Sequence, residues 1–441
     1  MVDLPPTIWL VLASIGLLAP TYALVLGFVA RRGIAPGTGD REDYLVFCMV
    51  PCLNEGRVVG PTVERLLALD PELQVVIIDD ASDDDTPEIL ASLNDPRVHV
   101  VRRELPNARV GKGAALNHAF AAICERVADE GRDPHQVIVG VFDGDGRVDA
   151  NALDAVLGWF GEPDVGGVQI AVRIDNRANS WLARMQDVEF STYAHIFQRA
   201  RNRLTSTGLG GNGQFTRLSA MRNLGPEPWA DTLTEDLDLG VRLRLIGWRT
   251  VFEGSVAVHQ QGLHRPAALL RQRTRWFQGH LQAWSLFPAL WGSQLKRRTK
   301  ADMNVHLFMP VLQLLLGAAM FGSFALLVRQ LIVRPEATLS ALASGPLIPW
   351  WYLLGFAVTP LVAAAYWRTA RDVGFWKGIG YAHAYALYTW VWFFAGWRAI
   401  ARQARGTHSW SKTARLEDVG EGGVAAGQPA VADAVGVGSR P

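Results

Sequence analysis

The sequence predicts an α/β cytoplasmic domain with a mostly parallel, Rossmann-like sheet, joined to transmembrane and interfacial α-helices. Short apolar runs alternate with helical patterns between residues 44 and 142, as in a sheet whose parallel strands are connected by helices. Long apolar segments flank this region, and the 49% hydrophobic content is high for a soluble protein. The formal net charge of +1 gives no reason to expect a nucleic-acid partner.

The strands are predicted from short apolar runs bounded by polar residues. They lie at 44–50, 73–78, 98–101 and 137–142, with helices at 61–69, 86–93 and 114–127 between them. Ligands bind such sheets beyond the carboxyl ends of the strands, so polar residues directly after a strand are the functional candidates. The three cysteines, Cys48, Cys52 and Cys124, lack metal-ligand spacing and are expected to be small buried residues in a reducing compartment.

Four apolar segments, at 7–30, 304–328, 346–367 and 378–397, are predicted to span a membrane. A signal peptide fits the first poorly, because Arg31 and Arg32 follow the apolar stretch instead of preceding it. Basic residues beside the first two spans place the region between them in the cytoplasm. Four crossings would leave the C-terminus outside, whereas the basic residues after position 397 favour the inside. Either a re-entrant or interfacial segment or an additional crossing would resolve this conflict, and the sequence leaves both alternatives open.

These features divide the chain into five parts. They are an N-terminal transmembrane helix (1–30), a cytoplasmic domain (31–263), interfacial helices (264–303), a C-terminal transmembrane region (304–400) and a largely disordered tail (401–441). Long helices are expected at 181–203 and 264–290, either in the membrane interface or packed on the soluble core.

The first candidate ligands follow the first two strands. Pro51, Asn54 and Glu55 end the first strand, and five acids lie within 79–85 after the second. One carboxylate could cap the next helix. The cluster as a whole, including Asp80, suits hydrogen bonding to a nucleobase and a ribose, both of which are rich in donors.

Two further motifs indicate a diphosphate. Lys112 lies between glycines at the start of a helix, where backbone N–H groups and its own charge favour an anion, although the spacing is not that of the NTPase phosphate loop. Asp143 and Asp145 follow the strand at 137–142 and can share Mg²⁺ or Mn²⁺ with a diphosphate. An ordinary turn is the alternative for this Asp-Gly-Asp sequence.

Two later motifs predict groups that act on the sugar. Glu235 and Asp236 begin a helical run, where acids favour the helix dipole, and Asp236 also suits a general base for a sugar hydroxyl. Gln272 and Arg275 share one face of a later helix, and Arg275 suits the charge of a leaving diphosphate. Trp276 suits stacking on a sugar ring. The alternative for this helix is an interfacial one with snorkelling arginines.

Seven short motifs between Tyr44 and Trp276 resemble, in order, those of family 2 glycosyltransferases. The resemblance is to the membrane-integrated branch that contains cellulose, hyaluronan and poly-N-acetylglucosamine synthases, and it implies a GT-A fold and a metal-dependent inverting mechanism. It implies nucleotide-sugar binding by Pro51, Asn54, Glu55, Asp80, Lys112 and Asp143, a metal at Asp143 and Asp145, catalysis by Asp236 with Glu235, Gln272, Arg275 and Trp276, and acceptor binding by Gly211, Asn212, Gly213 and Trp276.

The resemblance implies an integral protein of the plasma membrane that transfers sugar from a UDP- or GDP-linked donor to a growing β-linked glycan. The alternative is transfer of one sugar to a lipid acceptor, and a non-catalytic membrane scaffold is a remote third possibility. The chain has no large C-terminal regulatory domain and few spans for a polymer channel, so processivity stays open.

Overall fold

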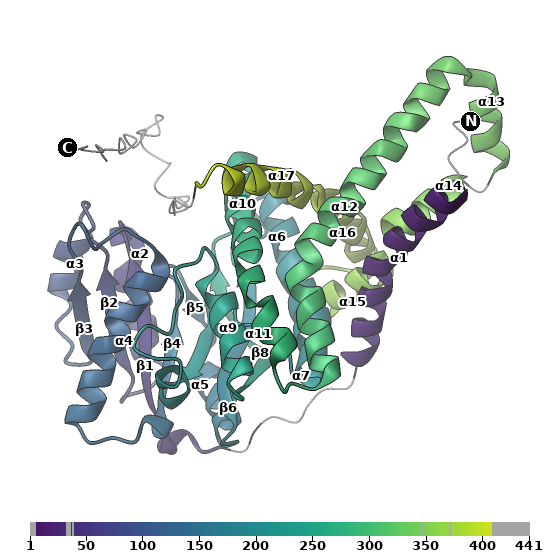
Figure 1. Ribbon diagram of the computed structural model, residues 1–441. Helices are drawn as coiled ribbons and strands as arrows, with labels where there is room; N and C mark the ends of the chain where they lie inside the picture. The colour runs from purple at the N-terminus through teal and green to yellow at the C-terminus, as the bar shows by residue number, and fades with distance from the viewer. Residues whose placement is uncertain (1–5, 32–36, 38, 346, 371, 408–441) are drawn as a thin grey trace, which may run out of the picture.

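The computed structural model describes residues 6–31, 37, 39–345, 347–370 and 372–407, and it contains a central sheet covered by helices on both faces (Figure 1). Its first half confirms the predicted alternation. The strands are β1 (Leu45–Cys52), β2 (Gln74–Asp79), β3 (Val98–Arg102) and β4 (Val137–Val141), and the helices are α2 (Gly56–Leu67), α3 (Thr86–Ser92) and α4 (Lys112–Asp129). Adjacent strands of this half pair in parallel, so their carboxyl ends meet at one edge.

The second half of the sheet is mixed. Its elements are β5 (Arg147–Val148), α5 (Ala152–Phe160), β6 (Val165–Ile174), β7 (Gln214–Arg217), α8 (Leu218–Arg222), α9 (Glu235–Leu245) and β8 (Arg249–Gln260). The eight strands lie in the order β3-β2-β1-β4-β7-β6-β8-β5, in which β7 runs antiparallel to both of its neighbours. Because β7 reverses direction, the loop that precedes it returns to the edge where β4 ends.

The central strands are apolar on both faces because helices cover both. In β1, Cys48 and Val50 contribute to one core and Phe47 and Met49 to the other. This is the continuous apolar pattern of a strand buried on both sides, and it explains why β1 was recognisable in the sequence.

The two long helices expected after the sheet are present, each with an irregular turn. The first consists of α6 (Trp181–Thr192), the π-helical turn η3 (Tyr193–Gln198) and α7 (Arg199–Leu204). The second consists of α10 (Pro266–Gln282), the 3₁₀ turn η4 (Ala283–Leu286) and α11 (Phe287–Gly292). Both pack against the sheet domain and against the C-terminal helices.

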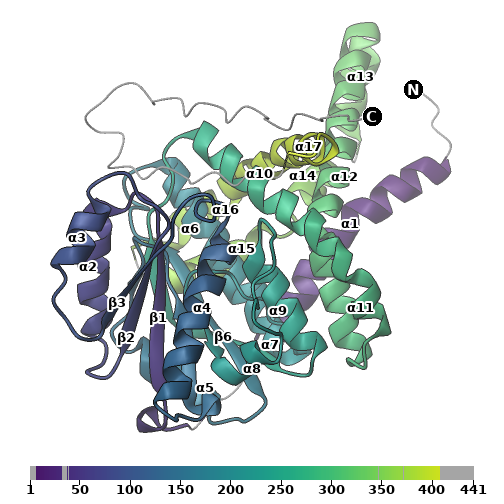
Figure 2. The ribbon, with the colours of Figure 1, turned by 60° about the vertical axis from the view of Figure 1, so that its left-hand side comes forward.

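Helices α1 (Pro6–Val29) and α12 (Arg297–Val333) extend away from the sheet, and α13 (Pro335–Ser344) follows at the far end of α12 (Figure 2). Within the described ranges, α12 is the one helix long and apolar enough to cross a membrane, and Pro20–Val29 is a shorter apolar stretch of α1. Apolar side chains of α12 such as Phe321 and Phe324 are exposed, as expected for a helix that contacts lipid.

The third and fourth predicted spans are broken helices. The third contains α14 (Leu347–Phe356) and α15 (Thr359–Thr369), and the fourth contains parts of α16 (Phe375–Tyr388) and α17 (Trp390–Ala404). At about 1.5 Å per residue, none of these helices alone crosses a hydrocarbon layer of about 30 Å. Each of these two segments therefore contains two shorter helices instead of one continuous helix. In the third, Pro360 lies in the first turn of α15, where proline starts a helix more readily than it continues one.

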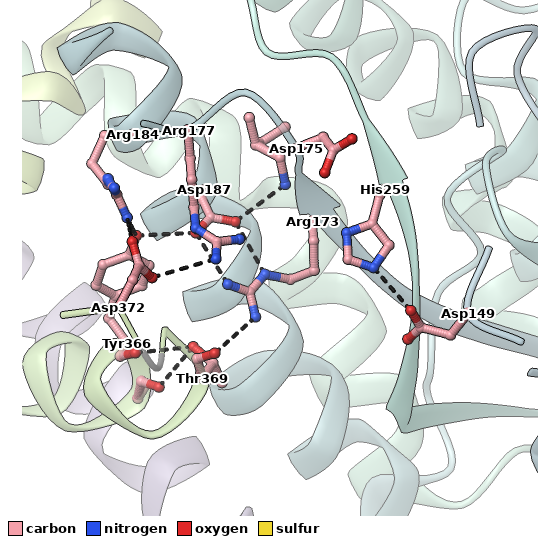
Figure 3. Close-up of polar contacts among 12 residues, drawn as sticks. Asp149, Arg173, Asp175, Arg177, Arg184, Asp187, His259, Tyr366, Thr369 and Asp372 are labelled. Carbon is pink, nitrogen blue, oxygen red and sulfur yellow. Dashed lines mark hydrogen bonds and ion pairs between the residues drawn. The ribbon is translucent and has the colours of Figure 1, made fainter. Parts of the chain in front are cut away.

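A buried ion-pair network joins the end of α15 to the sheet domain (Figure 3). The carboxylate of Asp187 in α6 is fully buried and accepts hydrogen bonds from Arg173 Nε at 3.0 Å and from Tyr366 Oη at 3.0 Å. Arg184 Nη1 lies 2.8 Å from Asp372 Oδ2, just beyond α15. The turn between α15 and α16 is thus fixed to the same body that carries the carboxyl edge of the sheet.

Candidate active site

The loops after β1 and β2 are tied together at the carboxyl edge. Asn54 Nδ2 donates to Asp83 Oδ1 at 2.7 Å, and the backbone N–H of Asp83 donates to Asn54 Oδ1 at 3.0 Å. The backbone N–H of Glu55 donates to Thr86 Oγ1 at 2.9 Å. The structure therefore brings the two predicted nucleotide motifs side by side, in the register set by the pairing of Cys52 with Asp79.

Asp80 is buried and held by two arginines that the sequence analysis missed. Arg103 Nη1 lies 2.5 Å from Asp80 Oδ1, and the backbone N–H of Arg109 donates to Asp80 Oδ2 at 3.0 Å. Burial raises the pKa of the Asp80 carboxyl, although Arg103 and Arg109 oppose this shift. Both arginines lie after β3, a short strand whose following loop offered no recognisable motif.

Asp143 and Asp145 lie just beyond β4 and contact different parts of the site. Lys112 Nζ donates to Asp143 Oδ1 at 2.7 Å, and the backbone N–H of Gln261 donates to Asp145 Oδ2 at 3.1 Å. Gly144 between them packs against Glu55, because a Cβ at this glycine would lie 3.1 Å from the Glu55 carboxyl carbon.

The Asp143–Asp145 pair fits a divalent cation bound together with substrate. Among the described residues, no group of three or more His, Cys, Asp and Glu side chains is arranged around a common point. Mg²⁺ is usually bound by only one or two carboxylates together with phosphate oxygens and water, so two aspartates are sufficient when a diphosphate is present. The donor set is thus compatible with a metal that arrives with the nucleotide.

The predicted acceptor loop approaches both Lys112 and Asp236. Gly211 has φ +70°, and a Cβ at this residue would lie 2.9 Å from Asp236 Oδ2 and 3.6 Å from Lys112 Nζ. A side chain there would be strained and would also collide with the carboxylate. Asn212 Oδ1 accepts from the backbone N–H of Asp143 at 3.3 Å, which joins the loop to the end of β4.

Gln169 of β6 organises this loop and was missed by the sequence analysis. Its side chain is buried; Oε1 accepts from the backbone N–H of Gly210 at 2.7 Å and Nε2 donates to the carbonyls of Asn212 at 2.9 Å and Gly213 at 3.2 Å. Gln260 accepts from Asn212 Nδ2 at 2.8 Å. Single glutamines in strands gave no sequence signal, because their partners come from loops that are distant in the chain.

Asp236 lies in the first turn of α9, where its Oδ1 accepts from the backbone N–H of Leu237 at 2.8 Å. Burial, together with the charge of neighbouring Glu235, raises the pKa of Asp236 to about 7, while Leu237 and Lys112 oppose the shift. Burial alone would lower the pKa of Lys112, but Asp143, Glu235 and Asp236 outweigh it and the pKa is raised. Lys112 therefore keeps its positive charge, and it lies close to the Asp236 carboxyl, whose pKa is about 7.

Helix α10 packs against the start of α9. A Cβ at Gly279 would lie 2.5 Å from Thr234 Oγ1, so the two helices touch directly at this point. Arg275 Nε is buried, and no hydrogen-bond partner for it lies within the described residues. A buried guanidinium nitrogen without a protein partner is consistent with an anionic ligand.

The ring of Trp276 is half-buried among a cation and other aromatic rings. The guanidinium of Arg273 lies 4.1 Å from the centroid of its ring, and Phe190 and Trp392 contact it at ring distances of 6.2 and 6.3 Å. Arg273 itself is fully buried and pairs with Glu189 at 2.5 Å, and its Nη1 donates to Gln272 Oε1 at 2.5 Å. Glu189 and Arg273 therefore support the helix that carries Gln272 and Arg275. The spacing of Gln272 and Arg275 in the sequence did not reveal these two supporting residues.

A carboxylate-lined sheet edge, a half-buried lysine and an acid at the start of a helix are together typical of an α/β transferase of the GT-A type. Residues 44–279, more than half of the chain, match the family model described as "Glycosyltransferase like family 2". The chain therefore belongs to the family 2 glycosyltransferases.

Two curated relatives carry the same name. The chain is 34% identical over 288 residues to the "Beta-monoglucosyldiacylglycerol synthase" of Synechocystis sp., covering 63% of this chain and 57% of that protein. It is 33% identical over 283 residues to the protein of that name from Trichormus variabilis, covering 62% and 57% respectively. The chain thus matches 57% of the length of these relatives.

One solved structure is similar over nearly the whole fold. It is the mannosyltransferase PcManGT from Pyrobaculum calidifontis in complex with GDP-Man and Mn²⁺, with a TM-score of 0.59 and 17% sequence identity, covering 89% of this chain and 97% of that chain. At this identity the likeness establishes the fold alone.

Proposed function

We propose that this chain transfers one hexose, with inversion, from a nucleotide-sugar to the hydroxyl of a membrane lipid such as diacylglycerol. The observation that carries the proposal is its identity of 33–34% with two relatives named as monoglucosyldiacylglycerol synthases. The exposed apolar side chains of α1 and α12 support it, because α1 contacts η3 and α7, and α12 contacts α7 and α10, the helix that carries Arg275. This lipid acceptor replaces the growing glycan as our leading interpretation.

In this proposal the nucleotide occupies the carboxyl edge. The loops that contain Pro51–Glu55 and Asp80 would bind the nucleoside, and the Nε of Arg275, which is unpartnered among the described residues, would donate to the diphosphate. Asp143 and Asp145 would hold Mg²⁺ or Mn²⁺, which neutralises charge on the leaving nucleoside diphosphate. Lys112 adds a fixed positive charge on the same side, beside Asp143.

Asp236 is the proposed general base. The acceptor oxygen forms a bond to the anomeric carbon as the bond between that carbon and the diphosphate oxygen breaks. The hydroxyl proton passes to Asp236, and the electron pair of the broken bond leaves with the nucleoside diphosphate. Attack from the face opposite the leaving group inverts the configuration. Glu235 acts indirectly, because its charge helps to raise the pKa of Asp236.

The proposed localisation is the plasma membrane, with the catalytic domain in the cytoplasm. The proposed membrane part consists of α1, α12 and the broken segment α14–α15, with α16 and α17 at the membrane surface. Contacts at three points support this surface position for α16 and α17. Asp372 pairs with Arg184, Tyr388 Oη donates to Glu189 at 2.8 Å, and Arg402 Nε donates to Gln278 at 3.2 Å. With three crossings, the basic residues of α17, Arg398 and Arg402, lie on the cytoplasmic side.

The test is a screen of UDP- and GDP-sugars with protein in nanodiscs that contain diacylglycerol and Mn²⁺ or Mg²⁺. We expect one donor to yield a lipid carrying a single sugar, identified by mass spectrometry. A ladder of longer glycans from the same donor would instead support a polymer synthase. Release of nucleoside diphosphate with no glycosylated product would leave hydrolysis as the activity and contradict the proposal.

A further inference from the structure

Tyr193 lies on the π-helical turn η3, between the catalytic edge and the membrane helices. Such turns are rare and occur frequently at functional sites. Its side chain is 37% exposed, and its Oη accepts a hydrogen bond from Arg201 Nη1 at 3.2 Å. Among the described residues, no acceptor is found for the Tyr193 hydroxyl proton.

His306 lies beside Tyr193, His280 lies beside His306, and both histidines have ring nitrogens that are not used in hydrogen bonds among the described residues. The ring of His306 on α12 lies 6.5 Å from that of Tyr193 and 5.7 Å from that of His280 on α10. His280 uses Nδ1 to contact the carbonyl of Trp276 at 3.0 Å. Within the described part of the chain, His280 Nε2 and both nitrogens of His306 make no hydrogen bond. Half-buried polar atoms of this kind indicate a ligand or water as their partner.

The acceptor loop connects this cluster to the proposed base. A Cβ at Gly208 would lie 3.6 Å from Tyr193 Oη and 3.8 Å from His306 Nε2, and three residues later Gly211 adjoins Asp236. Three residues span at most about 11 Å. The charge of Asp236 also contributes to the raised pKa of Tyr193, after burial and against the opposing effect of Arg201.

The cluster is fixed to the membrane helices by a buried polar network. Arg201 Nε lies 3.2 Å from Asp302 Oδ2 of α12, and Tyr22 Oη of α1 donates to Asp302 Oδ1 at 2.7 Å. Arg201 is therefore neutralised by Asp302, and both are buried. His306 therefore lies on the same helix as Asp302, close to the buried network that joins α12 to the catalytic domain.

We propose that Tyr193, His280 and His306 form the subsite for the uncharged, hydroxylated head of the lipid acceptor and direct its hydroxyl to Asp236. This inference rests on the proposed lipid acceptor. Burial and Arg201 lower the pKa of His280, so its imidazole is uncharged at neutral pH. A phenol and a neutral imidazole suit a glycerol-type head better than a lipid phosphate, which requires positive charge.

The experiment compares Tyr193→Phe and His306→Gln with Tyr352→Phe and His383→Gln in nanodiscs of varied diacylglycerol content. Tyr352 and His383 are the matched control, because Tyr352 Oη and His383 Nε2 form a hydrogen bond of 2.7 Å on α14 and α16. We expect each site variant to raise the acceptor KM about fivefold, the loss of one hydrogen bond. The Kd for the nucleoside diphosphate should stay within about twofold, and the control pair should match the wild type.

Gly208→Ala provides a variant that retains all three side chains. Its methyl group would be in van der Waals contact with Tyr193 Oη and His306 Nε2, so it should exclude an acceptor hydroxyl and raise the acceptor KM.

If the wild type glycosylates diacylglycerol and all three variants keep its acceptor KM, the proposed subsite is wrong and the proposed function stands. If the wild type prefers polyprenyl phosphate to diacylglycerol, the proposal that the acceptor has an uncharged head group is wrong. If it forms only polymer, the proposed function fails and the subsite fails with it.

Discussion

At the scale of single residues, the decisive feature is a carboxyl whose pKa lies close to physiological pH. Asp236 is half-buried next to the buried Glu235, and the two like charges cannot both be accommodated at low cost. A general base works best when its pKa is near the working pH. The adjacent Lys112 stabilises the ionised form, so the balance between these groups sets the pH range of activity.

The pH dependence of kcat/KM should therefore show an acidic limb near pH 7, with activity rising as Asp236 loses its proton. Because this pKa is raised in the folded protein, ionisation of Asp236 also lowers folding stability as the pH rises from about 4 through 7. Glu235→Gln removes the neighbouring negative charge and should move the limb to lower pH. A limb that stays in place would show that Glu235 does not control this titration.

Asp236→Asn should lower turnover by about 10²-fold or more, the usual scale for loss of a general base. Asparagine has nearly the same shape, so isothermal titration should find the Kd for the nucleoside diphosphate nearly unchanged. Weaker nucleotide binding with wild-type turnover would contradict the assignment of Asp236.

Asp145→Ala should abolish the effect of Mg²⁺ or Mn²⁺ on nucleotide binding, because one of the two carboxylates for the metal is lost. The measurement is nucleotide affinity with and without the metal. Asp175→Ala is the control, since Asp175 pairs with Arg147 at a more exposed position. Metal dependence equal to that of the wild type in Asp145→Ala would remove this residue from the site.

At the scale of elements, the orientation of α10 depends on side chains from outside the catalytic sheet. Arg273 of α10 pairs with Glu189 of α6, and Glu189 also accepts from Trp392 Nε1 at 2.7 Å and from Tyr388 Oη. These contacts join α6, α10, α16 and α17 into one unit. The C-terminal helices therefore help to hold the helix that carries Gln272 and Arg275.

Glu189→Gln should destabilise the protein by about 3 kcal/mol, because it leaves the buried charge of Arg273 without its counterion. We expect the midpoint of thermal unfolding in detergent to fall by several degrees. Glu130→Gln serves as control, because the Arg126–Glu130 pair is partly exposed and such helix pairs contribute only about 0.5 kcal/mol. Equal midpoints for the two variants would mean that the buried network is not needed for stability.

At the scale of the whole molecule, the catalytic body and the proposed membrane helices α1 and α12 meet at the proposed acceptor subsite. The ion pairs around Asp187 and Asp372 hold the end of α15 on the catalytic body (Figure 3). Since α17 also contacts α10, both ends of the α16–α17 pair contact the catalytic body. In the proposed topology of three crossings, this contact accounts for the basic residues of the last helix without an additional crossing.

Membrane-impermeant thiol labelling of intact cells should separate three crossings from four. Single cysteines at Glu336 and Gly406 are suitable, in a background without Cys124, the one native cysteine that is not fully buried among the described residues. We expect Glu336→Cys to react in intact cells and Gly406→Cys only after permeabilisation. Reaction of Gly406→Cys in intact cells would favour four crossings.

The sequence by itself determined the first half of the sheet and the order of the site motifs. Strands buried on both faces are continuous apolar runs, and polar residues beyond their carboxyl ends must meet at one edge, so β1, β2, β4 and Asp143 could be recognised locally. The helix that begins at Glu235 and contains Asp236 could likewise be recognised from neighbouring residues in the sequence. These features depend on neighbours in the chain, and the structure confirms the elements.

Only the tertiary structure decided which residues that are distant in the sequence contact one another. The antiparallel insertion of β7, the support of the acceptor loop by Gln169, and the pairing of Glu189 with Arg273 all join residues that are distant in sequence. Hydropathy also did not reveal that the fourth apolar segment contains two shorter helices, α16 and α17, that contact the catalytic domain. These contacts depend on pairs such as Arg184 with Asp372, which only the folded chain creates.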